Sequence, residues 1–236
     1  MDRWHAAAGR RYAPALWLMV LSALPLIVLG ASRDPFTSKD ASGALRTALV
    51  QGVDEAVNRL GSPDGFLQNP QYTIPLPPAL VKADRPLRLI GMSGDVEKLK
   101  TAMNHAAEMA VANARPLFKR AVLQMPIKDA KGLLRGGDTA ATSYFRKAMG
   151  LELARNFKHI VARATVRANA RQLYDEYAAK AAQVGFISSE DGSLNDYLTA
   201  SAMAAVFEEI GTQETAIRKD PASQKSALIR KVFGAL

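Results

Sequence analysis

The sequence contains no cysteine, which excludes a disulfide framework, a cysteine nucleophile and any metal site built on thiolates. Three histidines among 236 residues are too few for a histidine-rich metal centre, so we expect no metal and no cofactor. Aromatic residues make up only 7% of the chain, which leaves few rings to stack on nucleic-acid bases. Strand-like alternation, internal repeats and low-complexity tracts are also missing. The composition is otherwise that of a globular protein.

The N-terminal segment has the pattern of an export signal. Arg3, Arg10 and Arg11 precede an uncharged run of 19 residues at positions 13–31, which ends in the small residues of 30–32. Such a pattern is typical of a secretory signal peptide, and we expect cleavage after residue 31 and delivery to the periplasm. The alternative is an uncleaved inner-membrane anchor, because the run approaches the roughly 20 residues that span a bilayer.

The rest of the chain is basic. The whole sequence has 31 Lys and Arg residues against 22 Asp and Glu, a net charge of +9. Removing residues 1–31 takes away three basic side chains and one acidic side chain, which leaves +7. Residues 142–171 hold seven cations and the single acid Glu152, so this one segment carries nearly all of the excess.

Apolar residues after position 43 recur at helical spacing, and we expect an all-α, single compact domain at 43–234 after a short linker at 32–42. The prolines of 61–90 indicate irregular structure, with short helical turns before Gly91. Pro116 is expected to kink or split one long helix, and Gly150 to bend another. The expected helices span 45–60, 95–125, 128–134, 139–182, 194–219 and 228–233.

Several segments carry a family resemblance. They are the stretches 43–53 (Gly-Ala-Leu-Arg-Thr-Ala-Leu-Val-Gln-Gly-Val), 64–66, 74–77, 103–108, 137–145, 197–199, 217–221 and 231–234. In this order and spacing the chain resembles bacterial domain-of-unknown-function family 4197. The resemblance implies an exported, mostly helical bacterial protein, and it supplies no substrate, cofactor or catalytic residue. His105 stands where the family pattern favours arginine, and Gln213-Glu214 stands where paired acids are frequent.

One set of candidates has the residue types of acid–base catalysis. His105 and Glu108 lie three positions apart on an expected helix, and Asp138 falls in another family-like segment, so the three could serve a periplasmic hydrolase or lyase. The alternative is a polar helix face on which Asn104 and Glu108 flank the apolar stripe and position neighbouring elements.

A second candidate is the turn at Gly136-Gly137-Asp138-Thr139, which precedes an expected helix. Free backbone N–H groups there could bind an anion. A glycine that ends one helix and an Asp138 or Thr139 cap that begins the next explain the same residues.

The basic segment is the third candidate. Its cations include five that we predict to bind an anion or a partner: Arg155, Lys158, Arg163, Arg167 and Arg171. Arginines four apart on a helix are neighbours and repel one another, which favours an acidic partner. The alternative is a solvated face that Glu208 and Glu209 partly neutralise.

These observations favour an exported, non-enzymatic helical protein that binds an anionic envelope component or a protein partner. Anionic lipid or an acidic envelope polymer fits better than nucleic acid, which we do not expect for an exported chain. The other two hypotheses are the hydrolase or lyase above and a structural component of an envelope assembly.

Overall fold

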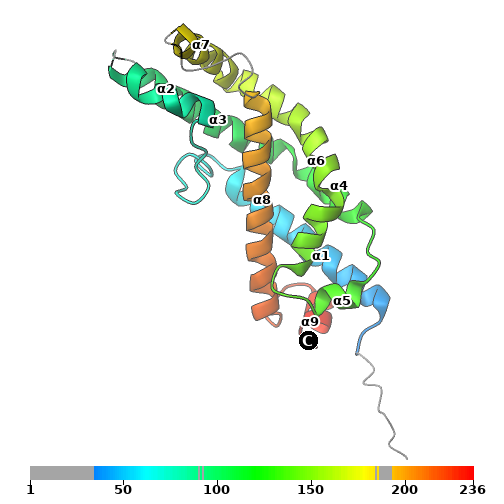
Figure 1. Ribbon diagram of the computed structural model, residues 1–236. Coiled ribbons are helices and arrows are strands. Elements are labelled where there is room, and N and C mark those ends of the chain that lie inside the picture. The colour runs from blue at the N-terminus through cyan, green and yellow to red at the C-terminus, as the bar shows by residue number, and fades with distance from the viewer. Residues whose placement is uncertain (1–34, 90, 92, 184, 186–192) are drawn as a thin grey trace, which may run out of the picture. The chain divides into compact units, whose positions relative to one another are not determined.

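The computed structural model describes residues 35–89, 91, 93–183, 185 and 193–236. The predicted signal segment, 1–31, lies outside these residues. Within them the secondary structure is helical and no strand occurs, which confirms the all-α class (Figure 1). None of the helices in these ranges combines the length and the apolar character needed to cross a bilayer. The helices are α1 (Ser38–Leu60), α2 (Pro78–Leu89), α3 (Ser93–Asn113), α4 (Arg115–Gln124), α5 (Ala130–Leu134), α6 (Ala140–Arg167), α7 (Ala170–Gln183), α8 (Leu194–Lys219) and α9 (Ala227–Phe233).

Helix α1 begins at a capping box. The Thr37 hydroxyl accepts a hydrogen bond from the Asp40 backbone N–H (3.1 Å), and the Asp40 carboxylate accepts one from the Thr37 N–H (3.0 Å). This start at Ser38 lies inside the range 32–42 that we expected to be a linker. The helix ends where predicted, at Leu60, and the N–H of Gly61 donates to the carbonyl of Val57.

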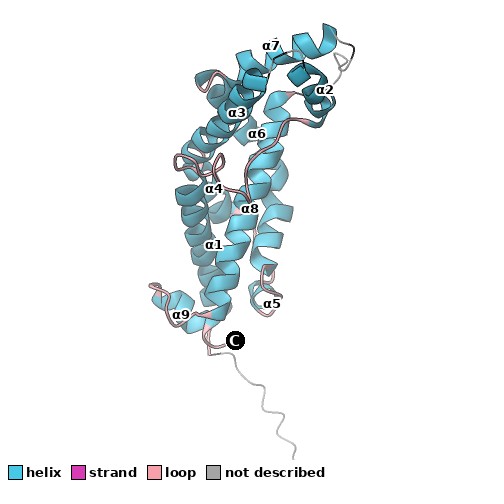
Figure 2. Ribbon diagram, turned by 90° about the vertical axis from the view of Figure 1, so that its left-hand side faces the viewer, coloured by secondary structure: helices cyan, strands magenta, loops and turns pink. Residues whose placement is uncertain are grey.

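The core lies where the long helices meet. Helix α8 packs against both α1 and α6, and α3 and α4 lie along α6 (Figures 1 and 2). Gly52 of α1 lets α8 approach closely, since a Cβ at this position would be 3.1 Å from the Ile210 side chain. The rings of Phe118 on α4 and Phe157 on α6 pack edge to face, with their centroids 5.8 Å apart, so the two helices are in direct contact.

Buried side chains of α3 hold the loop at 61–77. Asn104 is fully buried; its carbonyl oxygen accepts from the N–H of Ile74 (2.8 Å) and its amide donates to the Ile74 carbonyl (3.0 Å). Glu108 is also buried and accepts from the N–H groups of Phe66 and Leu67, both at 3.1 Å. These bonds satisfy backbone groups that a loop would otherwise leave unpaired away from water.

The split at Pro116 is confirmed, because α3 ends at Asn113 and α4 begins at Arg115 with proline in its first turn. For 61–90 we expected irregular structure followed by short helical turns before Gly91, and the second half instead forms one longer helix, α2. Pro78 starts α2, and Pro86 does not prevent the burial of its apolar face.

Gly150, where we expected the long helix to bend, lies within α6. Helix α6 runs unbroken through Gly150 to Arg167. The long run divides at Asn169 instead, whose φ of +58° lies in the left-handed region that stops a helix. Asparagine tolerates this conformation better than most side chains, and α7 begins at the next residue.

Candidate functional site

The structure places the acid–base candidates in different surroundings. His105 is exposed on α3, whereas Glu108 faces the core and its Oε1 atom is engaged by Phe66 and Leu67. Asp138 is exposed ahead of α6, and its backbone carbonyl accepts from the Thr215 hydroxyl at 3.5 Å. No hydrogen bond joins any two of the three candidates. Within the ranges described above, no cluster of three or more Asp, Glu or His side chains is arranged to hold a metal ion.

The turn before α6 is capped from another helix. Thr139 occupies the N-cap position, as the cap interpretation expected, but its side chain makes no capping hydrogen bond. The carboxylate of Glu214 on α8 accepts instead from the backbone N–H groups of Ala141 (3.0 Å) and Thr142 (2.7 Å). The first-turn N–H groups that an anion would need are therefore already bound by a side chain of the protein.

Two of the five predicted anion-binding cations have acidic partners within the fold. Lys158 pairs with Asp196 of α8 at 2.6 Å, and Arg171 pairs with Asp175 of α7 at 2.8 Å. These pairs are exposed, so each contributes little to stability.

The other three cations, Arg155, Arg163 and Arg167, have no acidic partner among the described residues. The Arg155 side chain is exposed and its Nε donates to the Leu151 carbonyl at 3.4 Å. Arg163 and Arg167 are exposed and have no hydrogen bond or ion pair with any residue the structure describes.

The acids expected to neutralise the basic segment are engaged elsewhere. Glu209 is buried on α8, where it pairs with Arg59 of α1 at 3.1 Å and accepts from the Tyr72 hydroxyl at 3.1 Å. Glu208 accepts from the side-chain amide of Gln71 at 2.7 Å. The alternative in which these two acids neutralise the α6 cations is therefore not supported by their contacts.

Arg163 and Arg167 lie on a groove that α6 forms with α3 and α4. A hollow of about 150 Å³ is lined by Met109, Asn113, Ile160, Arg163, Ala164 and Arg167. A neighbouring hollow of about 330 Å³ is lined by Leu117, Arg120, Ala121, Gln124, Met149, Glu152, Leu153, Asn156 and Ile160. The two hollows share Ile160, so we treat them together and name them the basic groove, after Arg120, Arg163 and Arg167.

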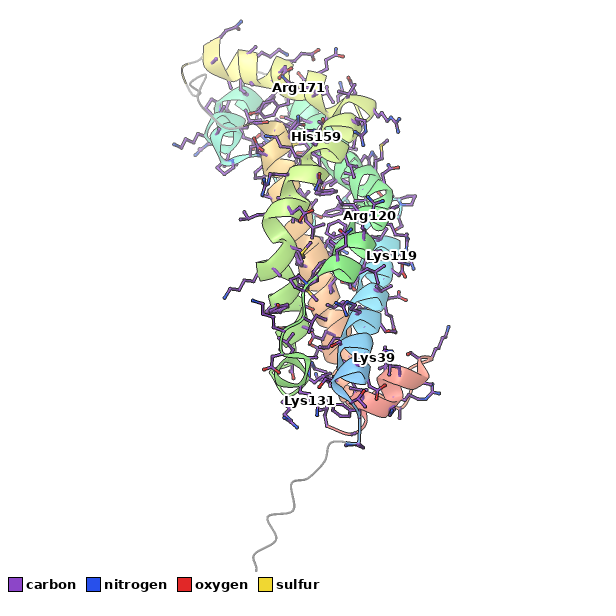
Figure 3. The ribbon with its side chains drawn as sticks, turned by 90° about the vertical axis from the view of Figure 1, so that its right-hand side faces the viewer. Lys39, Lys119, Arg120, Lys131, His159 and Arg171 are labelled. Carbon is purple, nitrogen blue, oxygen red and sulfur yellow. The ribbon has the colours of Figure 1, made fainter. Side chains whose placement is uncertain are left out.

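The basic groove has a net positive charge, which lies at its smaller hollow. Three arginines line it and Glu152 is the only acid in its walls. Arg120, like the two α6 arginines, makes no hydrogen bond or ion pair with a described residue. Figure 3 shows four basic or titratable side chains in order along one side of the helical unit, from Lys119 and Arg120 of α4 upward to His159 of α6 and Arg171 of α7. Lys119 differs from Arg120 because it pairs with Asp54 at 2.9 Å.

Arg120 was missed by the sequence analysis. It is 43 positions before Arg163, in a stretch, 115–135, that holds six Lys and Arg residues against the single acid Asp129, so a charge count extended to this stretch would have marked it. Only the packing of α4 on α6 brings it to the groove.

A third hollow, of about 680 Å³, lies between α6 and α8. The guanidinium of Arg146 lies over the buried Phe207 ring, 5.0 Å from its centroid, at this hollow. Hydroxyl side chains from both helices line it: Thr139, Thr142, Ser143, Thr212 and Thr215. The hollow is more neutral than the basic groove, because Glu208 accompanies Arg146 and Lys219 in its lining.

Comparison with protein-family models matches residues 35–234 to a family described as "Protein of unknown function (DUF4197)". No curated protein and no solved structure matches the chain. The match covers the helical unit from three residues before α1 to the residue after α9.

Proposed function

The chain belongs to the family described as "Protein of unknown function (DUF4197)", and from this premise we propose that it is an exported helical protein that binds an anionic component of the bacterial envelope. One observation carries the proposal. Arg120, Arg163 and Arg167 line one groove without a carboxylate partner among the described residues. Other exposed cations also lack an ion pair among the described residues, but these three arginines gather at one groove, and this gathering favours an external anion.

The charge arrangement favours binding over a purely structural role. Arg163 and Arg167 are neighbours on one helix face, and such a like-charge pair costs a helix a few tenths of a kcal/mol. An anion between them removes that cost and adds charge-assisted hydrogen bonds. Arginine suits this purpose because its fork of N–H donors fits phosphate and carboxylate oxygens.

Export is supported by the pattern of the first 31 residues and by the start of the family match at residue 35, after that segment. The anionic partner is then a molecule of the periplasm or the membrane surface. Sequencing the N-terminus of the protein isolated from cell envelopes tests this part of the proposal. A chain that begins near Ser32 supports cleavage, and a chain that keeps its first residues supports the membrane anchor.

Binding is tested with vesicles of phosphatidylglycerol, compared with vesicles of phosphatidylcholine, at low and high salt. The decisive variant is Arg120→Glu/Arg163→Glu/Arg167→Glu. The matched control is Lys82→Glu/Arg85→Glu/Lys225→Glu, which changes the net charge equally at exposed cations outside the groove. We expect salt-sensitive binding that the groove variant loses and the control retains. Equal loss in both variants, or no binding by the unchanged chain, would refute the proposal.

The hydrolase or lyase hypothesis has less support. The carboxylate of Glu108 is engaged by two backbone N–H groups, and no contact brings His105 toward it. The assembly hypothesis is addressed by the mass of the protein in solution. A large stable complex that survives the groove substitutions would favour it over anion binding.

A further inference from the structure

The smaller hollow of the basic groove has features of a site for one particular anion. It lies near the end of α6, where Arg163 and Arg167 line one side and Met109 and Asn113 of α3 line the other. No carboxylate contributes to its walls. We infer that this hollow binds a phosphoryl group through the two guanidinium forks, an inference that rests on the proposed anion-binding function.

The number of donors favours phosphoryl over carboxylate. A carboxylate has two oxygens and one arginine fork satisfies both. A phosphoryl group presents two to four non-bridging oxygens in a tetrahedral arrangement, and each oxygen accepts several hydrogen bonds, so it can accept from two forks at once. Arg163 and Arg167 are one helical turn apart, which places two forks along one wall of the same hollow.

The helix itself does not supply the attraction. The hollow lies near the C-terminal end of α6, where the helix dipole carries partial negative charge and opposes an anion. The carbonyls of Ala164 and Val166 are already capped by the N–H of Ala168. Asn113 cannot direct its amide fully at a ligand because that amide donates to the Met109 carbonyl at 2.6 Å. Binding therefore depends on Arg163 and Arg167.

The size of the hollow limits what enters it. About 150 Å³ accommodates a phosphoryl group with little else, whereas the adjoining hollow at Arg120 has about 330 Å³ for whatever the phosphoryl group is attached to. Two sources share this chemistry, a phospholipid headgroup and free inorganic phosphate. Ile160 lines both hollows, and a ligand that extends past it to fill both is larger than phosphate alone.

The test uses the ¹⁵N-labelled full chain and the Nε–Hε resonances of its arginines. Inorganic phosphate is titrated at constant ionic strength, and acetate is titrated in parallel. We expect saturable shifts at Arg163 and Arg167 with phosphate, weaker ones with acetate, and none at Arg155, which is exposed on the same helix. Equal effects of acetate and phosphate, or equal shifts at Arg155, would overturn the phosphoryl assignment.

A charge-preserving variant separates fork recognition from simple attraction. Arg163→Lys/Arg167→Lys keeps both charges and lacks the forks, and we expect about a tenfold loss of phosphate affinity. Its matched control is Arg155→Lys, which should bind as the unchanged chain does. Affinity retained by the double variant would refute the inference.

Vesicles of phosphatidylglycerol distinguish the two sources. If inorganic phosphate displaces the chain from the vesicles and shifts the same arginines, the headgroup occupies the hollow. If phosphate shifts them but does not displace the vesicles, free phosphate is the ligand, and the phosphoryl assignment still holds. Loss of vesicle binding in the triple Glu variant without any phosphate effect would sustain the proposed function and overturn this inference alone.

Discussion

Glu214 of α8 caps the N-terminus of α6 through Thr142: its Oε2 atom accepts from both the backbone N–H and the hydroxyl of that threonine, each at 2.7 Å. The other oxygen, Oε1, accepts from Ala141 N–H and pairs with Arg218 at 2.8 Å. Glu214 is 2% exposed and Arg218 11% exposed, so the pair lies largely away from water. A single carboxylate thus joins the two helices that line the hollow of about 680 Å³.

Replacing Glu214 by alanine should therefore be strongly destabilising. The change leaves the largely buried Arg218 without its counter-charge and the first-turn N–H groups of α6 without an acceptor. Breaking one side of a buried pair costs about 3–5 kcal/mol of unfolding free energy. Glu214→Gln should cost less, because its amide oxygen still accepts hydrogen bonds. Urea denaturation measures both.

The control for this prediction is Glu55→Ala on α1. Glu55 is exposed and should alter the unfolding free energy by no more than about 0.5 kcal/mol. Similar losses of unfolding free energy in Glu55→Ala and Glu214→Ala would contradict the stabilising role of the Glu214 cap.

Local patterns predicted most helices because their causes are local. The three-and-four spacing that starts at Leu45, the stop at Gly61 and the split at Pro116 depend on residues within a turn or two. The break at Asn169 was not predicted, because the sequence analysis expected one helix over 139–182. Asn169 adopts a left-handed conformation that sequence spacing does not reveal.

The sequence predicted only part of the candidate site, because some of its residues are brought together by contacts between helices. Helical spacing showed that Arg163 and Arg167 are neighbours, and this holds in the structure. It could not show that Lys158 meets Asp196 of α8, 38 positions away, or that Arg120 lies on the same groove as Arg163, 43 positions away. Pairing across helices decides which cations remain available for an external anion.

A second prediction concerns the loop held by Asn104. Asn104→Ala removes the partners of both backbone groups of Ile74, and each buried group left unsatisfied costs about 1–3 kcal/mol. We expect a loss of stability in urea and faster hydrogen exchange in the loop at 61–77. Asn156→Ala, at an exposed position on α6, is the control and should leave both measurements unchanged. Unchanged exchange in the Asn104 variant would contradict the anchoring role.

A third prediction follows from Tyr72. Burial, and then the charge of Glu209, raise the pKa of Tyr72 to about 12. A tyrosine in the unfolded chain ionises near pH 10, so the folded state binds the proton more tightly. The corresponding stability is fully present below pH 10 and is lost as the pH rises toward 12. In urea unfolding, Tyr72→Phe should show a shallower decline over this range, and an identical decline in both proteins would refute the effect.

The capping box at α1 predicts the opposite pH dependence. The N–H of Thr37 and the ammonium of Lys231, which lies 3.0 Å from the carboxylate, lower the pKa of Asp40 to about 2. Because the folded-state pKa lies below the usual value near 4, this contribution is present above pH 4 and disappears as the pH falls through 2. Asp40→Asn removes the charge at every pH, so the difference in urea midpoint between the two proteins should be largest at neutral pH and shrink toward pH 2. Glu55→Gln, at an exposed acid of the same helix, should give no such converging difference. A gap between the Asp40 variant and the unchanged chain that stays constant from pH 7 to pH 2 would show that the capping carboxylate is not what responds to acid.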